Sequence, residues 1–122
     1  MTEEEKLYET LGELLYAVAK ADGVIQDEEK AAMNNLLKGH PWEKQINWSF
    51  EYEASKEPTV EEIYTKVISY CQHYGPAPQY DEFINAMKII AEASGGMDDS
   101  ESKIIESFSS DLIKKFMRDI ES

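Results

Sequence analysis

Two stretches of this sequence are alike: YETLGELLYAVAKADGVIQDEEKAAMNNL at residues 8–36 and YDEFINAMKIIAEASGGMDDSESKIIESF at residues 80–108. They align without gaps at a constant offset of 72 residues, and six positions are identical. The identical pairs are Tyr8 and Tyr80, Ala19 and Ala91, Ala21 and Ala93, Gly23 and Gly95, Asp27 and Asp99, and Glu29 and Glu101. Each stretch therefore predicts the same unit, which is a helix, an acidic loop and a second helix.

Apolar spacing and capping signals place the helices of both units. An apolar stripe with spacings of three and four predicts a helix over about 3–21; it consists of Leu7, Leu11, Leu14, Leu15 and Val18. Asp27 is the expected N-cap of the second helix, which Gly39 ends. In the second unit we expect helices over about 80–93 and 100–119, with Asp99 as the N-cap of the latter.

Residues 42–56 lie between the two units and fit two structures. Ile46, Trp48, Phe50 and Tyr52 alternate with polar residues as in a strand, but the sequence offers no second strand for pairing. A short helix is the favoured interpretation, in which Ile46 neighbours Phe50 and Trp48 neighbours Tyr52. Either structure leaves a surface rich in aromatic side chains. The candidate partner-binding residues are Trp42, Trp48, Phe50 and Tyr52.

The remaining middle segment predicts one more helix and a sharp break. Thr59 with Glu62 forms a capping-box sequence, and the helix that it begins should end near His73. Residues 75–78, Gly-Pro-Ala-Pro, then form a tight connector rather than a flexible linker.

These elements predict an all-α protein, a single-domain helical bundle over residues 1–122. A lone hairpin cannot bury its apolar stripe, so two pseudo-repeated helix-loop-helix hairpins should pack together with the middle helices between them. The expected parts are repeat one at about 3–38, the middle segment at 42–74 and repeat two at about 79–119.

Charge and composition narrow the classes of partner. Twelve Lys and Arg against 25 Asp and Glu give a net charge of −13, which repels nucleic acid and anionic lipid. No apolar run approaches the ~20 residues that a membrane span requires, so no membrane insertion is expected. The N-terminus is acidic rather than basic, and Cys71 is the single cysteine, which together predict a cytoplasmic location.

The acidic loops fit two interpretations. In each, a Gly is followed six residues later by a Glu, as in the second half of a calcium-loop pattern, but the first half lacks its oxygen donors. The structural interpretation assigns these residues to helix caps and first turns. The functional interpretation assigns them to sites that hold calcium or magnesium loosely, with several waters retained. The candidate metal-binding residues are Asp22, Asp27, Glu29, Asp98, Asp99 and Glu101.

The sequence resembles the TerB-like (tellurite-resistance protein B) family, which consists of all-helical bacterial domains. The resemblance rests on residues 16–29, YAVAKADGVIQDEE, and on their echo at residues 90–101, IAEASGGMDDSE. It implies divalent-metal binding at the acidic loops, through Asp22, Glu29 and Glu101, and a role in stress-response or metal-resistance systems near the membrane. Ser94 stands where the first loop has Asp22, so a second symmetric site departs from the pattern.

Catalytic signatures are missing from the sequence. Cys71 and His73 are two residues apart and point to different faces of a helix, and neither a phosphate loop nor a hydrolase serine motif occurs. We therefore expect no enzyme. One hypothesis is a cation-responsive accessory domain in a bacterial tellurite- or metal-resistance system. The alternative is a metal-independent adaptor that holds a protein partner, either a basic surface or a membrane-associated resistance complex, through its acidic surface or an aromatic face.

Overall fold

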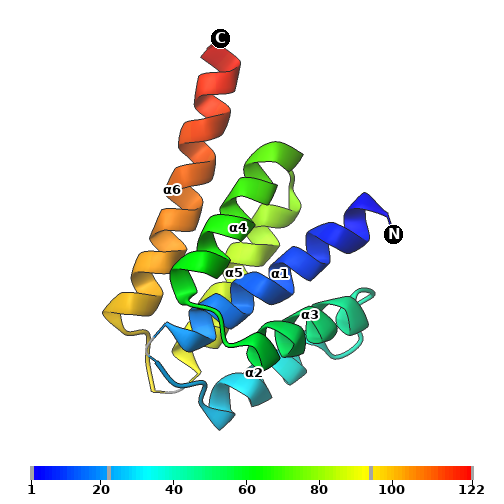
Figure 1. The fold of residues 1–122 in the computed structure, drawn as a ribbon, viewed down its shortest axis with the longest axis vertical. Coiled ribbons are helices and arrows are strands. Elements are labelled where there is room, and N and C mark those ends of the chain that lie inside the picture. Colours follow the sequence, from blue (N-terminus) through cyan, green and yellow to red (C-terminus); the bar gives the residue numbers. More distant parts are fainter. Residues whose placement is uncertain (1, 22, 94, 122) are drawn as a thin grey trace.

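The protein is seen here as a computed structural model that describes residues 2–21, 23–93 and 95–121, with side chains through residue 116. Six helices make up the described chain, and it contains no strand. They are α1 (Glu3–Lys20), α2 (Asp27–Leu37), α3 (Glu43–Lys56), α4 (Val60–Tyr74), α5 (Gln79–Glu92) and α6 (Asp99–Glu121). The predicted all-α bundle is confirmed, and residues 43–56 are the helix that the four-residue spacing favoured (Figure 1).

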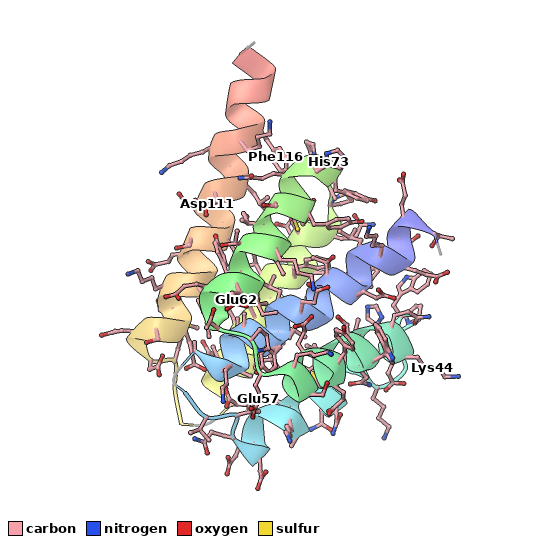
Figure 2. All side chains as sticks on the ribbon, in the orientation of Figure 1. Lys44, Glu57, Glu62, His73, Asp111 and Phe116 are labelled. Carbon is pink, nitrogen blue, oxygen red and sulfur yellow. The ribbon has the colours of Figure 1, made fainter. Side chains whose placement is uncertain are left out.

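Local capping explains where α1 and α4 begin and where α3 ends. Thr2 Oγ1 accepts the backbone N–H of Glu5 at 3.1 Å, which caps α1. Thr59 Oγ1 accepts the N–H of Glu62 at 3.1 Å, as the capping sequence predicted for α4. At the other end of α3, Glu57 adopts a left-handed conformation with φ of 51°, and its N–H bonds to the carbonyl of Glu53 before the chain turns to α4 (Figure 2).

Helix α1 is the centre of the bundle. It packs against α3, α4 and α5, and it crosses between them in Figure 1. The predicted apolar stripe is fully buried, and so are residues on other sides of the helix, Tyr16 and Ala17 among them. A helix that is buried on several sides carries no solvent-facing stripe, so apolar spacing identifies only part of its packing surface.

Gly12 allows α1 and α3 to approach closely. A Cβ at this position would overlap the carbonyl oxygen of Ile46 and would lie 2.9 Å from the Cβ of Ser49. Ile46 and Phe50 then point inward from α3 and are buried, and the Phe50 ring meets Tyr16 edge to face at 5.8 Å. The short helix is therefore tied to the core by its Ile46 and Phe50 face.

The second half of the chain packs around α5 and α6. The predicted connector ends α4 at Gly75, which has φ of 98°, and the Tyr80 hydroxyl lies 2.8 Å from its carbonyl oxygen. Helix α6 packs on α4 and α5 and projects past the other helices at its C-terminal end (Figure 1). Within the described residues, no helix is both long enough and apolar enough to cross a bilayer.

Candidate functional site

The first acidic loop joins α1 to α2 and turns at Gly23, whose φ is 101°. Glu29 is only 1 % exposed, and its Oε1 accepts the backbone N–H of Gln26 at 2.7 Å. Gln26 is the N-cap, so the prediction of Asp27 as the cap is wrong by one residue. Asp27 is the first residue of α2, where a negative charge is favoured by the positive end of the helix dipole, and it is exposed.

The second acidic loop repeats this arrangement 72 residues later. Gly95 has φ of 97°, and Glu101, 1 % exposed, accepts the N–H of Asp98 at 3.1 Å. Asp98 Oδ1 in turn accepts the N–H of Glu101 at 2.8 Å, which completes a reciprocal capping box. Asp98 is thus the cap, and the prediction of Asp99 is also wrong by one residue, because α6 begins at Asp99.

The structure separates the candidate metal-binding residues by their exposure. Asp27, Asp98 and Asp99 are exposed, whereas Glu29 and Glu101 point inward and are buried. Asp22 lies outside the described residues. In the part of the chain that the structure describes, no three His, Cys, Asp or Glu side chains are grouped closely enough to hold a metal ion. The described geometry is that of two helix caps.

The candidate aromatic residues also divide into groups. Trp48 and Tyr52 are 60 % and 45 % exposed, and their rings stack at 5.4 Å with an interplanar angle of 19°. We call these two residues the aromatic pair. Phe50 is buried in the core on the opposite side of α3 and is not part of that surface. Trp42 is half-buried, because its ring stacks on Tyr8 at 5.9 Å and its Nε1 donates to Glu4 at 3.3 Å.

Charged residues beside the aromatic pair give it a mixed character. The Lys56 ammonium group lies over the Tyr52 ring, 5.6 Å from its centre. A shallow cleft of about 290 Å³ lies next to Trp48 and is lined by Glu9, Lys44 and Gln45. Lys44 points away from the bundle near the start of α3 (Figure 2). The aromatic pair is therefore an apolar patch surrounded by polar groups, as protein-binding surfaces often are.

A polar cluster that the sequence did not predict joins three parts of the chain. Glu82 on α5 accepts the Tyr8 hydroxyl at 2.9 Å and contacts His40 Nε2 at 2.7 Å. His40 Nδ1 accepts the N–H of Trp42 at 3.0 Å, so the ring is the tautomer with its proton on Nε2, which donates to Glu82. Burial and the bond to the Glu82 carboxylate raise the pKa of Tyr8. Tyr8, His40 and Glu82 are far apart in the sequence, so no spacing pattern could predict this cluster. The one sequence signal near it was the identity of Tyr8 and Tyr80 in the repeat.

A second unpredicted cluster lies between α1, α3 and α4. Lys66 bonds to Glu13 at 3.3 Å and to Glu53 at 3.1 Å, and Glu53 is buried. Burial raises the pKa of Glu13, although Lys66 opposes the shift. Burial lowers the pKa of Lys66, but the two carboxylates raise it by more. One lysine thus bridges two carboxylates that are held close together and offsets part of their repulsion.

Cys71 lies in the core of the bundle. Its burial raises the thiol pKa to about 12, so the thiolate is scarcely populated at neutral pH.

Comparison with known protein families gives a match over most of the chain. The family model described as "Tellurite resistance protein TerB" matches residues 9–113, which include all of α2 to α5 and most of α1. No curated protein and no solved structure matches the chain. The matched region contains both acidic loops and the aromatic pair. Since the family model covers most of the sequence, the chain belongs to the tellurite resistance protein TerB family.

Proposed function

We propose that this TerB-family chain is a non-enzymatic accessory domain that binds a partner protein through the aromatic pair on α3. The observation that carries the proposal is the exposure of Trp48 and Tyr52, at 60 % and 45 %, although both are large stacked rings. Large aromatic side chains dominate the energy of protein interfaces, and here two of them adjoin one another. The family description supports a role in a tellurite-resistance system.

The charge of the chain indicates the chemistry of the partner. A net charge of −13 attracts basic surfaces and repels acidic ones. We therefore expect the partner to present apolar side chains for the aromatic pair, with Lys or Arg around them. Such a contact does not require a metal ion.

A pull-down tests this function. The wild-type chain is immobilised in the presence of a chelator and compared with the double variant Trp48→Ala/Tyr52→Ala and with Val24→Ala, which removes an exposed apolar side chain elsewhere. We expect the immobilised wild-type chain and Val24→Ala to retain a partner protein that the double variant does not retain. Equal recovery by all three proteins would contradict the assignment of the aromatic pair.

Cation binding at the acidic loops is the second candidate, favoured by the equivalent positions of Glu29 and Glu101. Each is buried to 1 % exposure and is close in sequence to exposed carboxylates, and hard divalent cations prefer oxygen ligands. Because no three described acidic side chains are grouped closely enough to hold an ion, binding would have to draw the loop carboxylates together. In this function the loops hold calcium or magnesium loosely, with several waters retained.

The cation site is tested by calorimetric titration of the wild-type chain with calcium and then with magnesium. Glu29→Gln and Glu101→Gln are suitable variants, because an amide oxygen still accepts the capping N–H while the charge is lost. Glu28→Gln is the control, since it removes the same charge from an exposed position. The proposal requires heat of binding that the two buried-site variants lose and the control keeps; absence of heat in the wild type rejects it.

A further inference from the structure

Three residues of α1 form the surface on which α3 packs. The Ser49 hydroxyl of α3 donates to the carbonyl of Glu9 at 2.6 Å, Gly12 lies against Ile46, and Tyr16 meets Phe50. The three residues follow at spacings of three and four, so they lie on one face of α1. In the first half of the molecule, this face is covered by an amphipathic helix.

The equivalent face of α5 has no such cover. At the offset of 72 residues it consists of Asp81, Ile84 and Lys88. Helix α5 packs on α1, α2 and α6, and within the described chain no α3-like helix lies over this face. Ile84 is accordingly half-buried, and Asp81 and Lys88 are exposed. The two halves thus differ in the presence of a covering helix.

A groove follows this uncovered face between α5 and α6. Its volume is about 640 Å³. The apolar residues along it are Ile84, Met97, Ile105 and Ile113. Ile113 is 59 % exposed, which is unusual for an isoleucine beside other apolar side chains. The other lining residues are serines, lysines and one glutamate, so an apolar strip lies among polar groups, as the apolar face of an amphipathic helix requires.

The corresponding positions in the first half explain why a groove forms here. Continuing the offset, Ser109 stands where α2 has Leu37, which is buried and 1 % exposed. Lys88 stands where α1 has Tyr16, which packs on α3. In the second half, Ser109 and Lys88 are thus smaller or more polar than their counterparts, whereas Ile84 is larger than Gly12 and rises from the middle of the face.

The charges of the groove indicate which helix would fit. Lys88 and Lys114 line it and form no ion pair with any residue that the structure describes, and Glu106 is the one acidic residue in the lining. With Asp81 on the same face of α5, the surface carries two lysines and two carboxylates, so it is less acidic than the net charge of −13 would suggest. The positions beside Lys88 and Lys114 favour acidic side chains on a bound ligand.

We propose that the groove between α5 and α6 binds an amphipathic helix of a partner protein, with its apolar stripe on Ile84, Ile105 and Ile113 and its acidic edge at Lys88 and Lys114. The bound helix lies on the face of α5 that is equivalent to the α3-covered face of α1, but farther out, because Ile84 replaces Gly12. This surface is separate from the aromatic pair, so the proposal does not depend on the function proposed above.

A displayed library of helical peptides tests the proposal with the full chain as target. The peptides keep a constant apolar stripe, and the flanking positions vary among Glu, Gln and Lys. We expect enrichment of Glu at the flanks and, with a selected peptide, amide NMR shifts that centre on Ile84, Ile105 and Ile113. Selection of Lys at the flanks, or no enrichment over the unselected library, would overturn the proposal.

Variants then locate the binding of the selected peptide. Ile113→Ser and the double variant Lys88→Glu/Lys114→Glu should each weaken affinity by about tenfold or more, since they remove an apolar contact and reverse the charge. These positions are exposed, so the fold should persist, which circular dichroism checks. Trp48→Ala should leave affinity unchanged; if it alone abolishes binding, the peptide sits on the aromatic pair and the groove proposal fails, while the aromatic-pair function stands.

Discussion

The two acidic hairpins have the same local structure but different surroundings. Gly23 and Gly95 adopt φ of 101° and 97°, and Glu29 and Glu101 each accept a backbone N–H three residues earlier. Yet α1 is buried on several sides by α3, α4 and α5, whereas α5 leaves its Ile84 face uncovered. The repeat therefore specifies the hairpins, and the middle helices decide how each hairpin is covered.

The two largest effects should come from features that only the first half has, and the first of these is the close contact at Gly12. Gly12→Ala places a Cβ against the Ile46 carbonyl, and we expect a net loss of about 2 kcal/mol in the free energy of unfolding despite the better helix propensity of Ala. Urea denaturation measures this loss. At the equivalent position of α5, Ile84→Ala removes a half-buried side chain, and we expect a smaller loss of about 1 kcal/mol. A neutral or stabilising Gly12→Ala would contradict the close packing of α3 on α1.

Lys66→Met tests the charged cluster, which also has no counterpart around α5. The substitution leaves Glu13 and Glu53 close together without a cation. We expect a loss of about 2 kcal/mol in the free energy of unfolding at pH 7. The loss is moderate because the Lys66 side chain is 56 % exposed, where water already screens its charge. Asn85, the equivalent of Glu13, is exposed, so Asn85→Ala is the matched control and should change stability by under about 0.5 kcal/mol.

The stability of the Lys66 variant should depend on pH in a defined direction. Burial already raises the pKa of Glu13 in the folded protein, and removal of Lys66 raises it further. Between the unfolded pKa of 4.5 and that raised value, the folded chain binds more protons than the unfolded chain, so stability increases as pH falls. The deficit of Lys66→Met relative to wild type should therefore shrink from pH 7 towards pH 5. A deficit that is constant or grows over this range would mean that lost packing, not charge, explains it.

The smallest of these effects should be equal in the two halves. Glu29→Ala and Glu101→Ala each remove the acceptor of one capping hydrogen bond, with an expected loss of about 1 kcal/mol apiece. Thermal unfolding of the two variants, side by side, measures the difference between them. Losses that differ by more than about 1 kcal/mol would show that the two carboxylates have unequal roles despite equivalent geometry.

The helix boundaries and the core stripe were predictable because they depend on local signals. Thr59 caps α4 as expected, and the stripe of α1 is buried throughout. The caps at Asp27 and Asp99 were misplaced by one residue, because Gln26 is a poor cap by type and Asp98 and Asp99 are both good ones. The aromatic surface was only partly predictable: a four-residue spacing pairs Trp48 with Tyr52, but the same pattern also contains Phe50, which the packing of α3 turns inward.

The sequence by itself determined the helices, their order, the repeat at 72 residues and the membership of the TerB family, since each depends on residue types at short spacings. Only the tertiary structure decided which carboxylates are buried, which aromatic rings are exposed and which face of α5 is uncovered. These properties depend on contacts between residues such as Gly12 and Ile46, or Tyr8 and Glu82, that are far apart in the chain. Periodicity describes one helix at a time, whereas burial is a property of how helices meet.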